Sequence, residues 1–148
     1  MWKILAIGHQ TTPWIQAGFE QYSTRLKKPY ALSMHTLTPQ PGGPQPDQEG
    51  QRLSQHIPKK AYVIALDAQG VQHSSESFAH QLELKSTQPV IFLIGGANGL
   101  SDAIKSNSDV IWSLSTLTFP HQLAALILAE QLYRTACILQ RHPYHRGH

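Results

Sequence analysis

The stretch "PVIFLIGGANGLS", residues 89–101, decides the fold of this chain. Its unbroken apolar run followed by glycines predicts a strand that is buried on both faces and ends in a glycine loop. In open α/β sheets, ligands sit just beyond the carboxyl ends of the strands, where Gly95, Gly96 and Gly99 fall. The glycines therefore favour either a ligand that approaches the backbone closely or a tight turn that needs positive φ.

The spacing of these glycines does not match two common nucleotide motifs. The sequence "GGANG" lacks the G-x-G-x-x-G pattern of dinucleotide sites, and no Lys-Ser or Lys-Thr pair follows it to make a phosphate loop. The loop alone therefore leaves a nucleotide-like ligand and a simple turn equally open.

Apolar strands alternate with helical segments on both sides of this stretch. We expect strands over 2–8, 30–38 and 61–67 and at the starts of 89–101 and 110–119, and helices over 13–26, 47–57, 74–83 and 120–140. The Pro- and Gly-rich segment 39–50 is expected to be a mobile surface loop. This alternation is typical of a mostly parallel sheet with helices on both faces. The chain is therefore predicted to be one α/β domain over residues 1–148.

The composition fits a soluble chain with one hydrophobic core. Its 148 residues are 41% hydrophobic and 14% charged, with a net charge of +3, which excludes a disordered chain and allows an anionic partner without requiring one. The single cysteine, Cys137, cannot form an internal disulfide, which fits a reducing compartment. No apolar run has the length of a membrane span or a signal-peptide core, so we expect a cytoplasmic protein.

The segment "WSLSTLTFPH", residues 112–121, places hydroxyl side chains among leucines. A loop this apolar is expected to be buried, and its backbone groups then need hydrogen-bond partners. Those partners are either a ligand, such as the edge of an adenine, or the hydroxyl groups of the loop itself.

The last predicted helix is apolar nearly all round between Leu123 and Ala129. Such a helix is expected to be buried on every side, which a small domain seldom achieves without a partner subunit. Glu130 and Arg134 follow at i, i+4 spacing and share one face. They form either an ordinary surface pair or, if partly buried, a pair with a functional task.

The chain ends in "QRHPYHRGH", which is either a metal site, a cloning remnant or a catalytic tail. His142, His145 and His148 are spaced by threes, but Pro143 breaks any helix that would align them. Because no second cysteine or acidic cluster supports them, we expect no metal.

Four motifs taken together, "FLIGGANGLS", "SLSTLTFPHQL", "AEQLYRT" and "HPYHR", give the chain a specific resemblance over its full length. The chain resembles the RlmH family, the ribosomal RNA large subunit methyltransferases H, which belong to the SPOUT class. The resemblance implies a C-terminal trefoil knot and a homodimer. It also implies methyl transfer from S-adenosylmethionine to N3 of a pseudouridine in large-subunit rRNA of the assembled ribosome.

The resemblance also assigns site residues by motif. The cofactor-binding residues it implies are Leu66, Gly95, Gly96, Leu114, Ser115, Thr116, Leu117, Thr118 and Phe119. The residues it implies around the target base are Glu130, Arg134, Tyr144, His145 and Arg146. Of these side chains, His145 lies nearest in titration range to the removal of the N3 proton, the arginines can stabilise developing charge, and Tyr144 can stack on the base.

The chain departs from the family pattern in the segment 39–50, which has no basic residue where relatives carry several. That difference puts the RNA contacts of this segment in doubt. Two alternatives stay open, a knotted methyltransferase that acts on another RNA such as tRNA, and a non-catalytic RNA- or nucleotide-binding module of the same fold.

Overall fold

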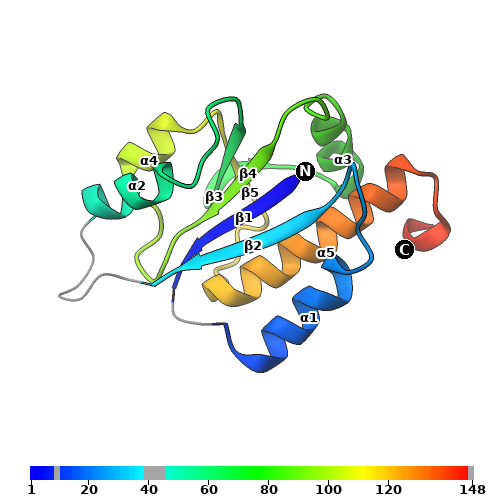
Figure 1. Ribbon diagram of the computed structural model, residues 1–148, viewed down its shortest axis with the longest axis horizontal. Coiled ribbons are helices and arrows are strands. Elements are labelled where there is room, and N and C mark those ends of the chain that lie inside the picture. Colours follow the sequence, from blue (N-terminus) through cyan, green and yellow to red (C-terminus); the bar gives the residue numbers. More distant parts are fainter. Residues whose placement is uncertain (9–10, 39–45, 147–148) are drawn as a thin grey trace.

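The computed structural model, which describes residues 1–8, 11–38 and 46–146, has the α/β architecture that the sequence predicts (Figure 1). Its elements are β1 (Trp2–Ile7), α1 (Pro13–Ser23), β2 (Leu32–Leu37), α2 (Pro46–Ser54), β3 (Tyr62–Gln72), α3 (Ser75–Glu83), β4 (Val90–Ile94), α4 (Asp102–Asn107), β5 (Val110–Ser113), α5 (His121–Leu139) and the 3₁₀ turn η1 (Pro143–His145). Within the described residues, the strands form one sheet in the order β2-β1-β4-β3-β5, and all neighbouring strands are parallel. This order is compatible with the trefoil knot, which stays a prediction.

Helices cover both faces of the sheet, as the apolar strands require. On one face, side chains of α1, α3 and α5 join strand residues such as Ile4 and Phe92 in one core. On the other face, Leu53 of α2 and Ile104 of α4 pack with strand residues such as Leu93. All of β4 is buried between the two layers, and each such side chain contributes about 1.5–3 kcal/mol to stability.

The structure corrects three expected boundaries. The helix expected over 47–57 begins at Pro46 and ends at Ser54, so residues 46–50 are helical rather than loop. The rest of the expected loop, residues 39–45, lies outside the described residues. Strand β3 continues to Gln72 instead of ending at residue 67, because its pairing with β5 resumes after a shift in register.

Helix α4 was not expected from the sequence. It is six residues long, too short to show helical periodicity, and it follows the glycine loop directly. The local signal for its start was Ser101, whose side chain caps the helix by accepting a hydrogen bond from the Ile104 N–H at 3.2 Å.

Within the single chain the last helix is not buried on every side, and the burial expected from a partner subunit stays a prediction. Helix α5 packs on the sheet between α1 and α3 and buries one stripe, which includes Leu128, Ala129 and Leu132. Its outer face keeps Leu123 and Ile127 only half-buried, because no described element covers that side. No helix of the described segments is both long enough and apolar enough to cross a membrane.

The glycine loop after β4 is a turn that closes on itself. The N–H of Gly99 donates to the carbonyl of Gly96 at 2.9 Å, and Gly99 has a φ of 73°, which strains other residue types. A Cβ on Gly95 would overlap the backbone of Gly99, whereas the nearest atom to a Cβ on Gly96 would be the Ile7 carbonyl oxygen at 3.5 Å. The turn therefore explains the glycines at 95 and 99 but not the one at 96.

This difference predicts a large loss of stability for one of two matched substitutions and a small change for the other. Gly95→Ala should lower the free energy of unfolding by about 2–4 kcal/mol, because the added methyl group forces the backbone of the turn apart. Gly96→Ala should change it by less than about 1 kcal/mol in either direction, since the methyl group meets only ordinary contacts. Urea denaturation measures both values. Equal effects of the two substitutions would contradict this description of the loop.

Candidate functional site

A pocket of about 570 Å³ opens at the carboxyl end of β4, beside the middle of β3, a volume suited to a small-molecule ligand. Three segments line it: residues 66–68 of β3, the glycine loop and the loop that leads into α5. All the expected cofactor-binding residues except Thr116 line this pocket, namely Leu66, Gly95, Gly96, Leu114, Ser115, Leu117, Thr118 and Phe119. Two hollows elsewhere have larger volumes, about 690 Å³ and 770 Å³. This pocket is therefore distinguished by the expected cofactor-binding residues that line it and not by its volume.

The loop between β5 and α5 is not buried, contrary to the prediction from its apolar sequence. Thr116, Leu117 and Thr118 are exposed, and the Leu117 side chain is 68% accessible. Hydroxyl groups hold the loop internally, because Ser113 Oγ donates to the Ser115 carbonyl at 2.9 Å and Ser115 Oγ accepts from the Leu117 N–H at 3.0 Å. The loop therefore presents apolar side chains to whatever covers the pocket.

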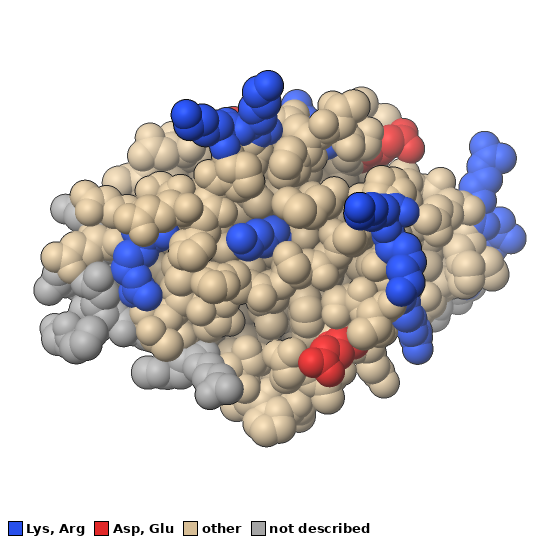
Figure 2. Space-filling model, in the orientation of Figure 1, with Lys and Arg blue, Asp and Glu red and all other residues tan. Residues whose placement is uncertain are grey.

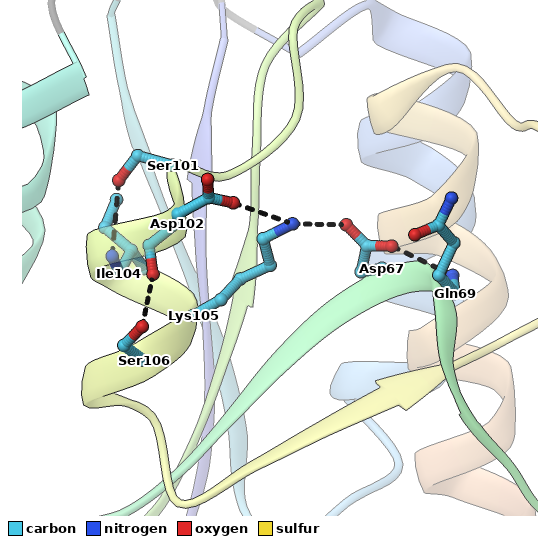
Figure 3. A network of polar contacts seen from close by, with 7 residues as sticks. All are labelled: Asp67, Gln69, Ser101, Asp102, Ile104, Lys105 and Ser106. Carbon is cyan, nitrogen blue, oxygen red and sulfur yellow. Dashed lines mark hydrogen bonds and ion pairs between the residues drawn. The ribbon is translucent and has the colours of Figure 1, made fainter.

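Asp67 lines the pocket and was not expected as a site residue. Figure 3 shows its carboxylate facing Lys105 of α4, at 3.3 Å from the Lys105 Nζ, while its other oxygen accepts from the Gln69 N–H. The same Nζ lies 3.7 Å from a carboxylate oxygen of Asp102. Because α4 directly follows the glycine loop, this ion pair ties the middle of β3 to the segment that carries the glycines.

His121, the first residue of α5, also lines the pocket and was not singled out. Its ring occupies the space above Gly8, where a Cβ would come within 2.5 Å of the His121 Nε2. That buried Nε2 has no hydrogen-bond partner among the residues that the structure describes. A buried polar atom at a pocket wall is typical of a site whose ligand or water supplies the partner.

Four of the five residues expected around the target base meet in a second cluster, on α5 and η1. Its centre is Glu130, whose Oε1 accepts from Arg134 Nε at 2.9 Å and from the Tyr144 hydroxyl at 3.2 Å. Gln131 Nε2 donates to the other oxygen at 2.7 Å. The Glu130–Arg134 pair is only partly exposed, so this is not an ordinary surface pair.

His145 connects this cluster to α3. Its Nδ1 lies 3.0 Å from Arg134 Nη1, and its Nε2 lies 2.8 Å from Glu76 Oε1. A guanidinium can only donate and a carboxylate can only accept, so both contacts are satisfied by a neutral imidazole that carries its proton on Nε2. Hydrogen bonding to His145 lowers the pKa of the Glu76 carboxyl.

Glu76 was missed as a site residue because its pairing spans two distant parts of the chain. In the sequence it marked only the first turn of a capped helix, and Ser74 does cap that helix by accepting from the Ser77 N–H. A carboxylate in a first helical turn is common, so this position carried no functional signal.

Tyr144 packs its ring edge-on against Tyr133, with the Arg134 guanidinium 4.9 Å from the ring centre. Burial and the neighbouring Glu130 raise the pKa of the Tyr144 phenol to about 12. The hydroxyl is therefore protonated at neutral pH and acts as a hydrogen-bond donor.

Arg146 is the one residue of the expected set that does not join the cluster. It is exposed, and its Nη2 donates to the carbonyl of Arg141 at 3.3 Å. The tail packs on the chain's own α5 and α3 through the contacts of Tyr144 and His145. Residues 1–8, 11–38 and 46–146 contain no group of three His, Cys, Asp or Glu arranged to hold a metal ion, and His148 lies outside them.

The pocket and the second cluster lie at different levels of α5. The pocket uses His121 and Ala124, whereas the cluster uses Glu130 and Arg134. Six residues separate Ala124 from Glu130 and ten separate it from Arg134, which is about 9 Å and about 15 Å along a helix. Figure 1 shows η1 at the far end of α5 from its start. Within one chain, the cluster therefore does not line the pocket.

Comparison with known proteins gives the family of this fold and site. A family model described as a predicted SPOUT methyltransferase matches residues 1–145. Relatives named ribosomal RNA large subunit methyltransferase H are 36% identical in Thioalkalivibrio sulfidiphilus, over 97% of both chains, and 40% identical in Stenotrophomonas maltophilia, over 98% of both chains. A relative of the same name in Burkholderia ambifaria is 36% identical over 97% of both chains. The chain therefore belongs to the SPOUT methyltransferase family, in the group of the ribosomal RNA large subunit methyltransferases H.

Proposed function

We propose that this chain is an S-adenosylmethionine-dependent enzyme that methylates N3 of a pseudouridine in large-subunit rRNA, acting as a homodimer on the assembled ribosome. The pocket between the end of β4 and the middle of β3 carries this proposal, because the expected cofactor-binding residues other than Thr116 converge there from three separate segments. Membership in a methyltransferase family supports the reaction class, and the relatives' name supports rRNA as the substrate.

Two features of the pocket fit a nucleoside-based methyl donor. Gly96 has no side chain although the protein leaves ordinary space for one, so a ligand can approach its backbone. His121 Nε2 is buried without a partner among the described residues and can bond a polar group of the ligand. When bound, S-adenosylmethionine would supply a methyl group that its positively charged sulfur has already activated. The tasks left to the protein are alignment and removal of the N3 proton.

A homodimer would bring a cluster and a pocket together although the two lie apart within one chain. The cluster on α5 and η1 would act at the pocket of the partner subunit, since about 9–15 Å of rigid helix keeps it from its own. Two apolar side chains near the start of α5 support an interface there. Leu117 precedes the helix and is 68% exposed, and Trp14 of α1 is 64% exposed, close to where Thr12 N–H donates to Gln122 Oε1 of α5.

The hydrogen bonds within the cluster support a different role for each of its residues. Tyr144 keeps its proton because its pKa is about 12, and Glu130 is occupied by three donor residues. His145 is the remaining candidate for the base: Glu76 holds the proton on its Nε2, and the lone pair of Nδ1 would accept the substrate proton once Arg134 moves to the substrate. Arg134 would then stabilise negative charge on a base carbonyl. Glu76 is thus a positioning residue.

Gly96→Val tests the donor site. The substitution should weaken binding of S-adenosylmethionine at least about tenfold, because two methyl groups would fill the space that the ligand needs. Isothermal titration calorimetry measures the affinity, and thermal denaturation checks that the variant is folded. Wild-type affinity in a folded Gly96→Val variant would mean that no ligand approaches this glycine. A wild-type chain that binds no donor would favour the non-catalytic alternative.

Mixed dimers test whether the cluster acts on the partner. His145→Ala and Gly96→Val chains, each inactive alone, should recover activity when co-expressed with different tags. A mixed dimer holds one intact pocket facing one intact tail, and random pairing of two equal pools should restore about a quarter of wild-type methylation of ribosomes. Inactive mixed dimers would show that each tail serves its own pocket.

The substrate assignment has a separate test. A preference of the wild-type enzyme for tRNA over ribosomes would overturn it.

Glu76→Gln tests the positioning role, with Glu83→Gln on the same helix as the control. Glutamine keeps the hydrogen-bond acceptor but removes the charge that stabilises a protonated imidazole, so kcat should fall at least about tenfold while the KM for the donor stays unchanged. The acid limb of the pH–rate profile should also move to lower pH, because the imidazole then protonates less readily. If Glu76→Gln behaves like Glu83→Gln, the pairing has no catalytic role.

A further inference from the structure

Basic side chains gather on the sheet face that α2 and α4 cover in part. The parallel register places Lys3 beside Ser33 and Leu5 beside His35, and Leu5 points into the core under α2 and α4. Lys3 and His35 therefore lie on that same face. Ser33 and His35 are exposed and Lys3 is half-buried, so this part of the sheet is accessible.

Two histidines from different elements stack at the centre of this group. The rings of His35 in β2 and His56, just after α2, lie 4.6 Å apart at 31°. Arg52 is held next to the end of β2, because its Nη1 donates to the carbonyl of Thr38 at 2.6 Å. The backbone bond of Arg52 and the contact between the two rings hold these three side chains together.

The charge of this group is not balanced by nearby described carboxylates. Burial lowers the pKa of His56 most, and His35, Lys3 and Arg52 lower it further, with no carboxylate acting in the opposite direction. Helix α2 also contains Asp47 and Glu49, whose side chains lie outside the described residues.

The described carboxylates with basic partners lie elsewhere on the chain. Those ion pairs are Asp67 and Asp102 with Lys105, Glu130 with Arg134, and Glu76 with His145. Figure 2, which has the orientation of Figure 1, shows basic side chains spread over the visible surface and few acidic ones. The surface around the stacked histidines is thus suited to an anion.

We propose that Lys3, His35 and His56 form a phosphate-binding surface that contacts the backbone of the substrate RNA. This inference rests on the proposed function and adds where the RNA lies on the chain. RNA presents a phosphate at every nucleotide, and each phosphate oxygen can accept from an ammonium or a protonated imidazole. The surface adjoins the end of β2, where the segment 39–50 begins without any basic residue of its own. It would therefore supply the RNA contacts that this segment lacks.

The proposal predicts RNA binding that strengthens on acidification. Phosphate favours the charged imidazole, so RNA binding should offset the lowered pKa of His56 and take up a proton there. The double variant His35→Gln, His56→Gln should bind a labelled large-subunit rRNA fragment about tenfold more weakly near pH 6, with little difference near pH 8. Lys3→Gln should weaken binding at both pH values. His80→Gln, an exposed histidine on α3 across the sheet, is the matched control.

Fluorescence anisotropy at several salt concentrations gives the affinity and its salt dependence. Each lost phosphate contact should reduce the slope of log K against log salt by about 0.7–0.9. Calorimetry with S-adenosylmethionine should give wild-type affinity for all these variants, because none lines the pocket. The double variant and Lys3→Gln could both bind RNA with wild-type affinity and salt slope. That result would overturn the proposed phosphate-binding surface and leave the proposed function intact. A wild-type chain that binds the donor but neither the rRNA fragment nor assembled ribosomes would overturn both.

Discussion

The rigid length of α5 is the constraint on which the functional architecture depends. The helix has 19 residues and so extends about 28 Å. Leu128, Ala129 and Leu132 fix it on the sheet, with α1 and α3 on either side. Its first residue forms a wall of the pocket and its end leads to η1, so the two functional groups of the chain are held apart by a packed helix that cannot bend to join them.

Hydrogen bonds hold the side chains of the cluster at the end of α5 in place. Glu130 neutralises Arg134 and accepts from Tyr144, and Glu76 fixes the proton of His145. Removing one partner from such a network leaves a partly buried charge uncompensated, which is costly. The chain therefore carries a preorganised set of donors and acceptors whose remaining freedom lies at the contact between Arg134 and His145.

The sequence predicted the parts of the fold whose signals are local. The apolar run of β4 and the tight turn at the glycines after it each depend on neighbouring residues, and the structure confirms both. Helix α4 was missed because six residues do not complete two turns. The loop around Leu117 was predicted to be buried because its sequence is apolar, but in a single chain nothing described covers it.

The candidate site was predictable only where a motif carried it. The family resemblance named the pocket residues, yet the roles of Asp67 and Glu76 depend on partners far along the chain, Lys105 and His145. No local pattern encodes such pairs. Arg146 lies in the same short motif as Tyr144 and His145, but the chain turns it towards the Arg141 carbonyl instead of the cluster. Proximity in the sequence therefore did not guarantee a shared site.

The most direct measurement of the central claim is a crystal structure of the dimer with S-adenosylhomocysteine bound. We predict that the ligand lies against Gly96 of one subunit and that the His145 imidazole nearest to it belongs to the other subunit. A dimer in which the nearest His145 comes from the same chain as the occupied pocket, or a ligand bound away from the glycine loop, would contradict the account.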